Sequence, residues 1–253
     1  MTFDKVLVFD ISGDYAHFRK FNTTTSPLTY CLPSRPTLAG LLGAVLGVER
    51  EIGPNDYPAG VVPVNELFHP ERCALAIRLI HPVNKSRIGF NLINTKNSFF
   101  NISPKAGRTQ IEYEFLKDPL FRVYLYHDQP KIMEELTERI RDNRPYFSPY
   151  FGLAQLAAQF SYRGTKSCEL RSATGYVRID SAVNLSALTG KNPIRFGEGF
   201  YSVDTFPNLM RRDRTVENYA EILVERGGAN GPGLTVACPE FYCVGDSENI
   251  LLL

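Results

Sequence analysis

The segment Thr37–Val48 constrains the fold most, because it joins a helix start to an unusual number of small residues. Proline near the first turn, with a hydroxyl residue beside it, is a normal start signal, and Pro33–Thr37 supplies both. Each glycine inside a helix costs about 1 kcal/mol relative to alanine. The small residues lie along one side of the segment: Gly40, Gly43, Ala44 and Gly47. We therefore expect a helix that packs closely against a sheet.

Apolar and alternating segments on either side of this helix predict the strands of that sheet. The segments that predict strands are Lys5–Ile11, Cys73–His81, Thr109–Phe115, Phe121–His127, Tyr176–Ile179, Tyr219–Glu225 and Leu234–Val244. Pro130–Asn143 has apolar residues at helical spacing, with acids early and arginines late, which predicts an amphipathic helix. Tyr150–Phe160 predicts a short apolar helix or a turn of helix, and Gly227–Gly233 predicts a hairpin-type connection.

The order of these elements predicts the fold class. Strand, helix, strand, insertion, strands and helix over residues 1–160 match a split βαβ unit, so we predict an α+β protein with a ferredoxin-like N-terminal domain. Residues 161–253 are expected to form a smaller β-rich region packed on that domain. RNA-recognition modules share this fold with many unrelated proteins, so the fold does not by itself assign a function.

Composition excludes several classes of protein. Hydrophobic residues make up 43% and charged residues 22% of the chain, and the formal net charge is +1. A nucleic-acid site would therefore need clustered charge. No apolar run approaches the roughly 20 residues of a membrane helix, and the first residues do not resemble a signal peptide. Five cysteines without C-x-x-C spacing predict free thiols in a reducing cytoplasm, and no membrane association is expected.

Positive charge does cluster in the insertion 84–108, which contains no Asp or Glu. Cations can follow a phosphate backbone, while exposed aromatic rings stack on bases at about 1–3 kcal/mol per base. We interpret the segment as an exposed hairpin or loop that binds single-stranded RNA. The alternative is a solvated loop whose phenylalanines fold onto the core. The candidate binding residues are Lys85, Arg87, Lys96, Phe99, Phe100, Lys105 and Arg108.

Two other basic groups could extend such a surface. One surrounds the free N–H groups at the start of the predicted helix, where an anion is favoured. The other is the segment Tyr162–Lys166. Ordinary helix capping explains the first group equally well, and a simple turn explains the second at least as well. The residues concerned are Arg19, Lys20, Ser34, Arg35, Thr37, Arg163 and Lys166.

No motif predicts a metal centre or a cofactor site. The four histidines include no pair at i,i+4 and no H-E-x-x-H motif. The sequence also lacks a G-x-x-x-x-G-K-[ST] loop and a G-x-S-x-G elbow. We therefore expect no metal and no cofactor.

Two runs, Gly13–Lys20 and Pro33–Gly47, resemble the N-terminal signature of the "Cas-five" family, CRISPR-associated subunits of the repeat-associated mysterious protein (RAMP) type. The shared pattern is a glycine, a small residue, aromatic and basic residues, and then a proline–serine–threonine start to a small-residue helix. Pro149–Gln155 resembles a later segment of that family. The closest resemblance is to the type I-B branch.

The resemblance implies a non-catalytic subunit of Cascade, the multi-subunit interference complex of CRISPR antiviral defence. Such subunits bind the 5′ handle of the CRISPR RNA (crRNA), contact the backbone and large subunits, and meet target DNA only indirectly. In this family a projecting hairpin, the thumb, crosses the RNA, and the insertion near 84–108 is the candidate thumb. The residues matched to the signature, and so assigned to the handle, are Arg19, Lys20, Ser34, Arg35 and Thr37.

Two alternatives stay open. Relatives in the type I-C branch cut precursor crRNA without a metal, which requires a base for the 2′-OH and an acid for the leaving oxygen. The second alternative is a scaffold that binds only proteins. No adjacent Lys–His pair supports the endoribonuclease, although several side chains could supply its acid and base: Tyr30, His17, His81, His127 and Lys85.

Overall fold

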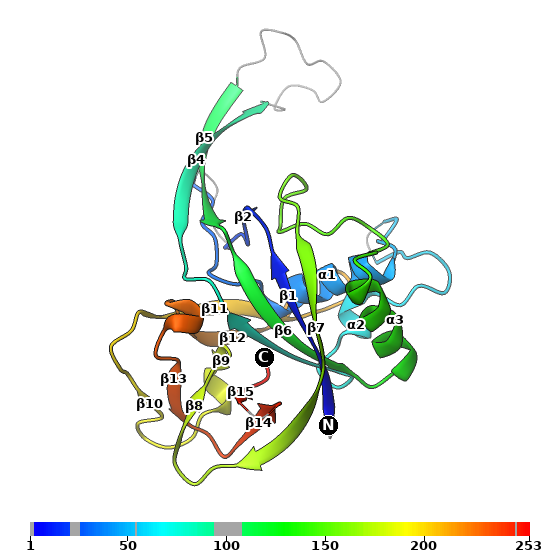
Figure 1. The fold of residues 1–253 in the computed structure, drawn as a ribbon. Helices are drawn as coiled ribbons and strands as arrows, with labels where there is room; N and C mark the ends of the chain where they lie inside the picture. Colours follow the sequence, from blue (N-terminus) through cyan, green and yellow to red (C-terminus); the bar gives the residue numbers. More distant parts are fainter. Residues whose placement is uncertain (1–2, 21–25, 54, 94–107, 246) are drawn as a thin grey trace.

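The computed structural model describes residues 3–20, 26–53, 55–93, 108–245 and 247–253 (Figure 1). Its largest sheet has six strands in the order β15-β14-β7-β1-β6-β3, and every neighbouring pair is antiparallel. We call it the main sheet. Its strands are β1 (Lys5–Ser12), β3 (Cys73–Leu79), β6 (Leu120–His127), β7 (Gln159–Ser172), β14 (Glu240–Val244) and β15 (Glu248–Ile250).

Two helices cover one face of the main sheet. α1 (Arg35–Leu46) follows β1 in the chain, α3 (Pro130–Arg141) follows β6, and the two helices contact each other. Both contribute to the main core together with β1 and β6. The predicted order of strands and helices up to α3 is confirmed. Within the described residues, no helix has the length and apolar character needed to cross a membrane.

The sequence predicts that the small residues of α1 pack against the sheet. In the structure they lie on other sides of the helix. A Cβ at Gly43 would clash with Val64, the first residue of α2 (Val64–Leu67). Gly47 ends α1 with φ of 80°, and a Cβ there would clash with the ring of Tyr146. The leucines of α1 face the core instead. The small residues therefore make room for α2 and for the loop after α3.

The opposite face of the main sheet is also buried, which explains the continuous apolar run of β1. Phe9 points into the main core with the helices, whereas Val6 and Val8 belong to a second cluster on the other face. Val244 of β14 and Ile250 of β15 complete that second cluster. The first strand, β1, and the last two strands, β14 and β15, therefore belong to the same sheet.

Two three-stranded antiparallel sheets and a third core cluster form most of the remaining region. Their orders are β10-β13-β8 and β11-β12-β9. The three predicted strand segments are confirmed, although the last one is divided into β13 and β14. β9, β10 and β11 were not predicted. The strands are β8 (Tyr176–Ile179), β9 (Val183–Asn184), β10 (Ile194–Arg195), β11 (Tyr201–Met210), β12 (Val216–Glu225) and β13 (Leu234–Ala237).

Two expectations around position 160 were wrong. Tyr150–Phe160 forms turns and a bridge between Tyr150 and Ala157 instead of a helix. Tyr162–Lys166 lies inside β7 and not in a turn. β7 pairs with both β1 and β14, so the main sheet continues across the expected domain boundary at residue 160. Pairing with β1 supplies hydrogen bonds that local periodicity does not reveal.

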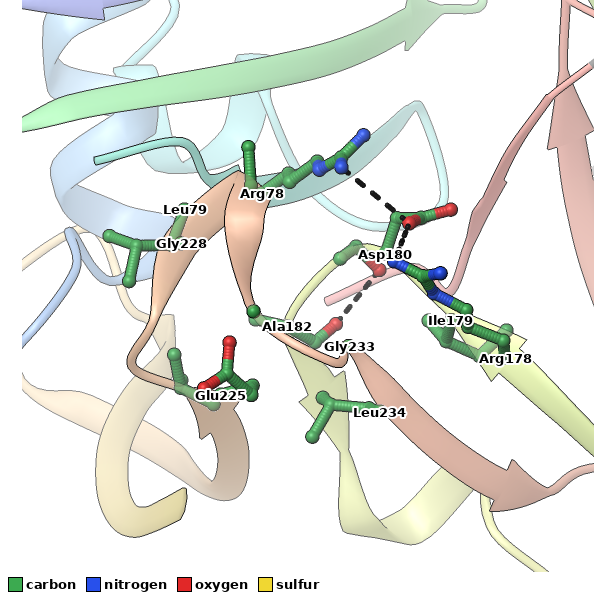
Figure 2. A pocket seen from close by; sticks show the side chains of 14 residues that line it. Arg78, Leu79, Arg178, Ile179, Asp180, Ala182, Glu225, Gly228, Gly233 and Leu234 are labelled. Carbon is green, nitrogen blue, oxygen red and sulfur yellow. Dashed lines mark hydrogen bonds and ion pairs between the residues drawn. The ribbon is translucent and has the colours of Figure 1, made fainter. Parts of the chain in front are cut away.

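The glycine-rich connection Gly227–Gly233 is not a hairpin, because β12 and β13, which it joins, pair with other strands. It wraps around the buried carboxylate of Glu225, whose Oε1 accepts a hydrogen bond from the backbone N of Gly227 at 2.8 Å. A Cβ at Gly228 would clash with the carbonyl oxygen of Ile80, just beyond β3. Figure 2 shows the small pocket where this connection meets β3 and β8.

Candidate nucleic-acid interface

β4 (Lys85–Ile93) and β5 (Arg108–Lys117) form an antiparallel hairpin that projects from the body of the protein (Figure 1). The insertion 84–108 therefore provides the first arm of this hairpin. The predicted strand Thr109–Phe115 is the second arm and not a strand of the main sheet. Four predicted binding residues lie outside the described residues: Lys96, Phe99, Phe100 and Lys105.

The described part of the hairpin carries three of the predicted cations. Arg87 and Arg108 are exposed. The Nζ atom of Lys85 donates to Oε1 of Glu114 at 2.7 Å and to the carbonyl oxygen of Thr29 at 2.9 Å. Burial raises the pKa of Glu114. The hydrogen bond and the charge of Lys85 act in the opposite direction, and the net shift is downward. The second arm thus brings acids that the first arm lacks.

The segment Tyr15–Lys20, which carries part of the family-like signature, lies at the base of the hairpin. β2 (Tyr15–Ala16) pairs with the end of β5. His17 donates from Nδ1 to the carbonyl oxygen of Glu114 at 2.7 Å. This segment and the insertion were predicted as separate basic groups, and the structure brings them together. We call this region, made of Tyr15–Lys20 and the adjoining parts of β4 and β5, the hairpin base.

Aromatic rings pack the hairpin base. The ring of Tyr113 has its centroid 5.2 Å from that of His17 and 5.3 Å from that of Phe90. Phe90 is also 5.5 Å from Phe115. Such pairs contribute about 0.5–1.5 kcal/mol each beyond burial. For Phe90, the alternative in which a phenylalanine of the insertion packs inward is therefore confirmed. Burial lowers the pKa of His17, so its imidazole is neutral at pH 7.

Arg19 and Lys20 are adjacent in sequence but differ in their surroundings. Arg19 is exposed, and its backbone bridges to Thr29. Lys20 forms an ion pair with Asp204 of β11, and its Nζ lies 5.3 Å from the ring centroid of Tyr30. Lys20 therefore ties the hairpin base to the C-terminal strands, and Asp204 reduces the positive potential that Lys20 offers to a phosphate.

Ser34 and Thr37 cap the first helix. The Oγ of Ser34 accepts a hydrogen bond from the backbone N of Thr37 at 3.4 Å and lies 2.9 Å from the Oγ1 of Thr37. This is the ordinary N-cap arrangement that the sequence allowed as the alternative.

Arg35 is buried, with 5% of the residue exposed. Its guanidinium donates to the carbonyl oxygens of Phe68 at 3.1 Å, of Cys73, and of Leu253 at 3.5 Å. These contacts join α1 to the start of β3 and to the end of the chain. The assignment of Arg35 to an RNA phosphate is therefore corrected to a structural role, because the charged end faces carbonyl groups inside the protein.

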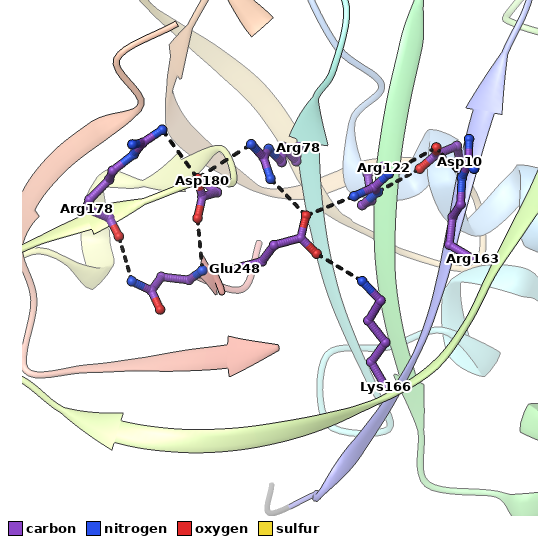
Figure 3. A network of polar contacts seen from close by, with 9 residues as sticks. Asp10, Arg78, Arg122, Arg163, Lys166, Arg178, Asp180 and Glu248 are labelled. Atoms are coloured by element: carbon purple, nitrogen blue, oxygen red, sulfur yellow. Dashed lines mark hydrogen bonds and ion pairs between the residues drawn. The ribbon is translucent and has the colours of Figure 1, made fainter. Parts of the chain in front are cut away.

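Arg163 and Lys166 lie on the face of the main sheet opposite α1 and α3 (Figure 3). Nε of Arg163 donates to Oδ2 of Asp10 at 2.7 Å, and Nζ of Lys166 lies 3.5 Å from Oε2 of Glu248. They are part of a larger set of ion pairs, which we call the sheet-face network. Its members are Asp10, Arg78, Arg122, Arg163, Lys166, Arg178, Asp180 and Glu248.

The carboxylates of the sheet-face network lie beneath its cations. The side chains of Asp10, Glu248 and Asp180 are 2%, 9% and 11% exposed, and every cation is more exposed than these. Arg122 joins two of the acids, donating to Asp10 at 2.8 Å and to Glu248 at 2.9 Å. The hydrogen bond to Asp10 raises the pKa of Arg122. The network therefore presents positive charge to solvent.

Most of this network was not predicted from the sequence, although a signal was present. β1, β3 and β6 are apolar runs, and each contains a charged residue: Asp10, Arg78 and Arg122. A charge inside an apolar strand predicts a buried partner. The register places Asp10 opposite Arg122 and Arg122 opposite Arg78. Asp10, Arg78 and Arg122 become partners because β6 lies between β1 and β3 in the sheet. The sequence alone did not predict that order.

Solved structures with a similar fold come from CRISPR systems. A chain of a CRISPR RNA-guided surveillance complex is 11% identical with a TM-score of 0.50, covering 92% of this chain and 91% of that one. A CRISPR protein from Archaeoglobus fulgidus is 11% identical with a TM-score of 0.50, covering 97% of each chain. A chain of the type III-B Cmr-beta complex bound to cognate target RNA and AMPPnP is 10% identical with a TM-score of 0.50, covering 92% and 86%. At these identities the similarity establishes the fold alone.

The sequence comparison is more specific. Residues 6–196 match the family described as CRISPR-associated protein (Cas_Cas5). The chain therefore belongs to the CRISPR-associated Cas5 family, and the family predicted from Gly13–Lys20 and Pro33–Gly47 is confirmed. No match was found among curated protein sequences. The type I-B branch stays a prediction.

Proposed function

We propose that this protein is a subunit of a type I CRISPR interference complex and binds the 5′ handle of crRNA. One observation carries the proposal: the segment Tyr15–Lys20 lies at the base of a projecting hairpin. Arg19 and Arg87 are both exposed, so a single strand that lies across this junction can contact them. Membership of the Cas5 family supports the CRISPR role.

In this proposal the hairpin β4–β5 is the thumb, and the domain that carries it is ferredoxin-like. The order β1, α1, β3, β6, α3, β7 along the chain and β7-β1-β6-β3 across the sheet supports this assignment. The hairpin is inserted between β3 and β6, at the end of the sheet where β6 begins. It can therefore lean over a bound strand without interrupting the core.

The proposed partners are the backbone and large subunits of Cascade, with target DNA met indirectly through them. The solved structures with this fold include chains of multi-subunit CRISPR complexes, which supports a subunit role. A largely apolar groove of about 790 Å³ beside α1 also supports contacts with other proteins, because exposed apolar patches of this kind mark interaction sites. Exposed apolar residues in and near that groove include Ile52, Val62, Tyr146, Phe147 and Tyr150.

We propose a non-catalytic role, because the candidate acids and bases are engaged elsewhere. The hydroxyl of Tyr30 donates to a backbone carbonyl at 2.8 Å, and burial raises the pKa of Tyr30 to about 12. His17 and His127 are 2% and 1% exposed, and burial lowers the pKa of both. Lys85 is paired with Glu114, and Nδ1 of the exposed His81 donates to the carbonyl oxygen of Asp118 at 2.9 Å. A discrete product from repeat RNA incubated with the pure protein in chelator would overturn this part of the proposal.

RNA retention by the assembled complex tests the proposal. Arg87→Gln with Arg108→Gln removes two exposed cations of the hairpin, and Arg141→Gln with Arg144→Gln removes two exposed cations at the end of α3 as a matched control. Each phosphate that is no longer neutralised lowers the salt dependence of single-strand binding by about 0.7, so the slope of the hairpin variant should fall by about 1.4. The control should keep the original slope. A hairpin variant that retains full-length crRNA with an unchanged slope contradicts the proposal.

A further inference from the structure

We propose that the sheet-face network forms a second binding site, which holds a phosphate group of the RNA apart from the hairpin; this inference rests on the proposed RNA binding. A hollow of about 450 Å³ opens over the network. We call it the phosphate pocket. Its lining contains four cations, Arg78, Arg122, Lys166 and Arg178, and two acids, Asp180 and Glu248.

The inner wall of the pocket is rigid. Oε1 of Glu248 accepts hydrogen bonds from Arg78 at 2.8 Å and from Arg122 at 2.9 Å. These are normal lengths for strong charge-assisted bonds. A guanidinium has five N–H donors, so Arg122 keeps donors beyond the three that Asp10 and Glu248 use, and Arg78 keeps donors beyond the one to Glu248. The buried Glu248 therefore holds two guanidinium groups at the bottom of the hollow, and both keep N–H donors for a ligand.

The outer cations are held loosely. In the described part of the chain, the ion pairs at the charged ends of Arg178 and Lys166 are long: Arg178 lies 3.8 Å from Asp180, and Lys166 lies 3.5 Å from Glu248. These distances exceed the 2.7–2.9 Å typical of N⁺–H···O⁻ bonds. Their side chains are 57% and 36% exposed. A phosphate in the hollow would give both cations a closer partner than they have now.

The balance of charge favours an anion. The network contains five cations and three carboxylates, so positive charge is in excess by two. Burial raises the pKa of Glu248, but Arg122, Lys166 and the hydroxyl of Tyr124 together lower it by more, so Glu248 stays ionised at neutral pH. A phosphodiester carries one negative charge and a terminal phosphate up to about two. Either would bring the network closer to neutrality.

The size and position of the pocket also suit RNA. A water molecule takes about 30 Å³ in the liquid, so the hollow has room for a phosphate group together with water. In Figure 3 the cations follow one another across the sheet from Arg163 through Arg122 and Arg78 to Arg178. Asp10, which holds Arg163, lies two residues from the end of β1, where Ser12 pairs with Leu120 just after the hairpin returns to the sheet. A strand that leaves the hairpin base can therefore reach the pocket.

The test uses the pocket variant Lys166→Gln with Arg178→Gln, which removes the outer cations and leaves Arg78, Arg122 and Glu248 in place. Single-stranded RNA with a 5′-hydroxyl and with a 5′-phosphate is titrated in a salt series, with the variant Arg141→Gln with Arg144→Gln as control. We expect the salt slope to fall by about 0.7 for each phosphate that the variant no longer neutralises. A fall with both RNAs identifies an internal phosphodiester as the ligand. A fall only with the 5′-phosphorylated RNA identifies the terminal phosphate.

The outcomes separate this inference from the proposed function. If the hairpin variant has a lower slope and the pocket variant binds both RNAs like the wild type, the pocket is only structural and this inference is overturned, while the proposed function stands. If only the pocket variant has a lower slope, the pocket is supported and the role of the hairpin is overturned. An unchanged denaturant midpoint in the pocket variant confirms that the weaker binding does not reflect unfolding.

Discussion

The hairpin base and the sheet-face network are built from the same residue types, yet burial gives their charges different tasks. At the hairpin base, Lys85 and Glu114 pair with each other, and their side chains are 27% and 14% exposed. In the network, Asp10 and Glu248 are 2% and 9% exposed, and each is shared between two or more cations. In the proposed function the charges at the hairpin can meet a ligand, whereas the buried acids of the network hold the fold together.

Physical magnitudes support this contrast. An exposed ion pair contributes about 0–1 kcal/mol, because water screens it and two long side chains must be ordered. Removing one member of a buried pair costs about 3–5 kcal/mol, because the other charge is left desolvated. Changes to the buried acids of the network should therefore act mainly on folding, and changes to exposed cations, at the hairpin or on the network, mainly on binding.

The largest effect is expected for Glu248→Gln. This change removes the negative charge that Arg78 and Arg122 share, so the free energy of unfolding should fall by about 3 kcal/mol, the lower end of the range for a buried pair. Denaturant unfolding measures the change. Glu169→Gln is the matched control, since Glu169 is 68% exposed and pairs with Arg171 on the same strand as Lys166. If both variants lowered the unfolding free energy equally, buried and exposed carboxylates would not differ in their contribution to stability.

A smaller effect is expected for Arg35→Met. The variant keeps an unbranched side chain but leaves the carbonyl oxygens of Phe68 and Cys73 without their donor, so the unfolding free energy should fall by about 1–3 kcal/mol. The salt slope for RNA should not change, because Arg35 is buried. A lowered slope in a variant of normal stability would return Arg35 to the RNA-binding surface.

The two regions should also lose stability in different pH ranges. Burial lowers the pKa of His17, so below about pH 6.5 the unfolded chain takes up a proton before the folded one, and the unfolding free energy falls as pH falls. The pKa of Glu248 is lowered from 4.5, so its stabilisation is lost only below about pH 4.5. His17→Asn keeps a donor for the carbonyl oxygen of Glu114 and should flatten the profile just below about pH 6.5. An unchanged profile would assign that range to other groups, such as His127.

The smallest effect is expected for Lys85→Gln. The ion pair with Glu114 lies at the edge of the hairpin base, so its removal should lower the unfolding free energy by no more than about 1 kcal/mol. Thermal unfolding of the purified chain measures it. A decrease as large as that of Glu248→Gln would show that the hairpin base is as tightly coupled as the network.

Sequence patterns predicted secondary structure reliably where residues close together in the chain determine it. The helical period of Pro130–Asn143 and the apolar runs of Cys73–His81 and Phe121–His127 correspond to α3, β3 and β6 within a few residues. They were unreliable where a distant strand decides it. Tyr150–Phe160 has the composition of a helix, but its end joins β7, which β1 holds in place. The alternation in β5 likewise predicted a strand of the main sheet, whereas its partner is the other arm of the hairpin.

The sequence by itself determined the family, through Gly13–Lys20 and Pro33–Gly47, and the positions of β1, β3, β6 and both long helices, because these depend on local pattern. Only the tertiary structure decided which charges meet. Arg122 is 112 residues from Asp10, and Arg78 is 170 residues from Glu248, so no local signal could pair them. Sheet order and register bring these charges together in space, and burial decides which of them lie beneath the surface and which are exposed to solvent.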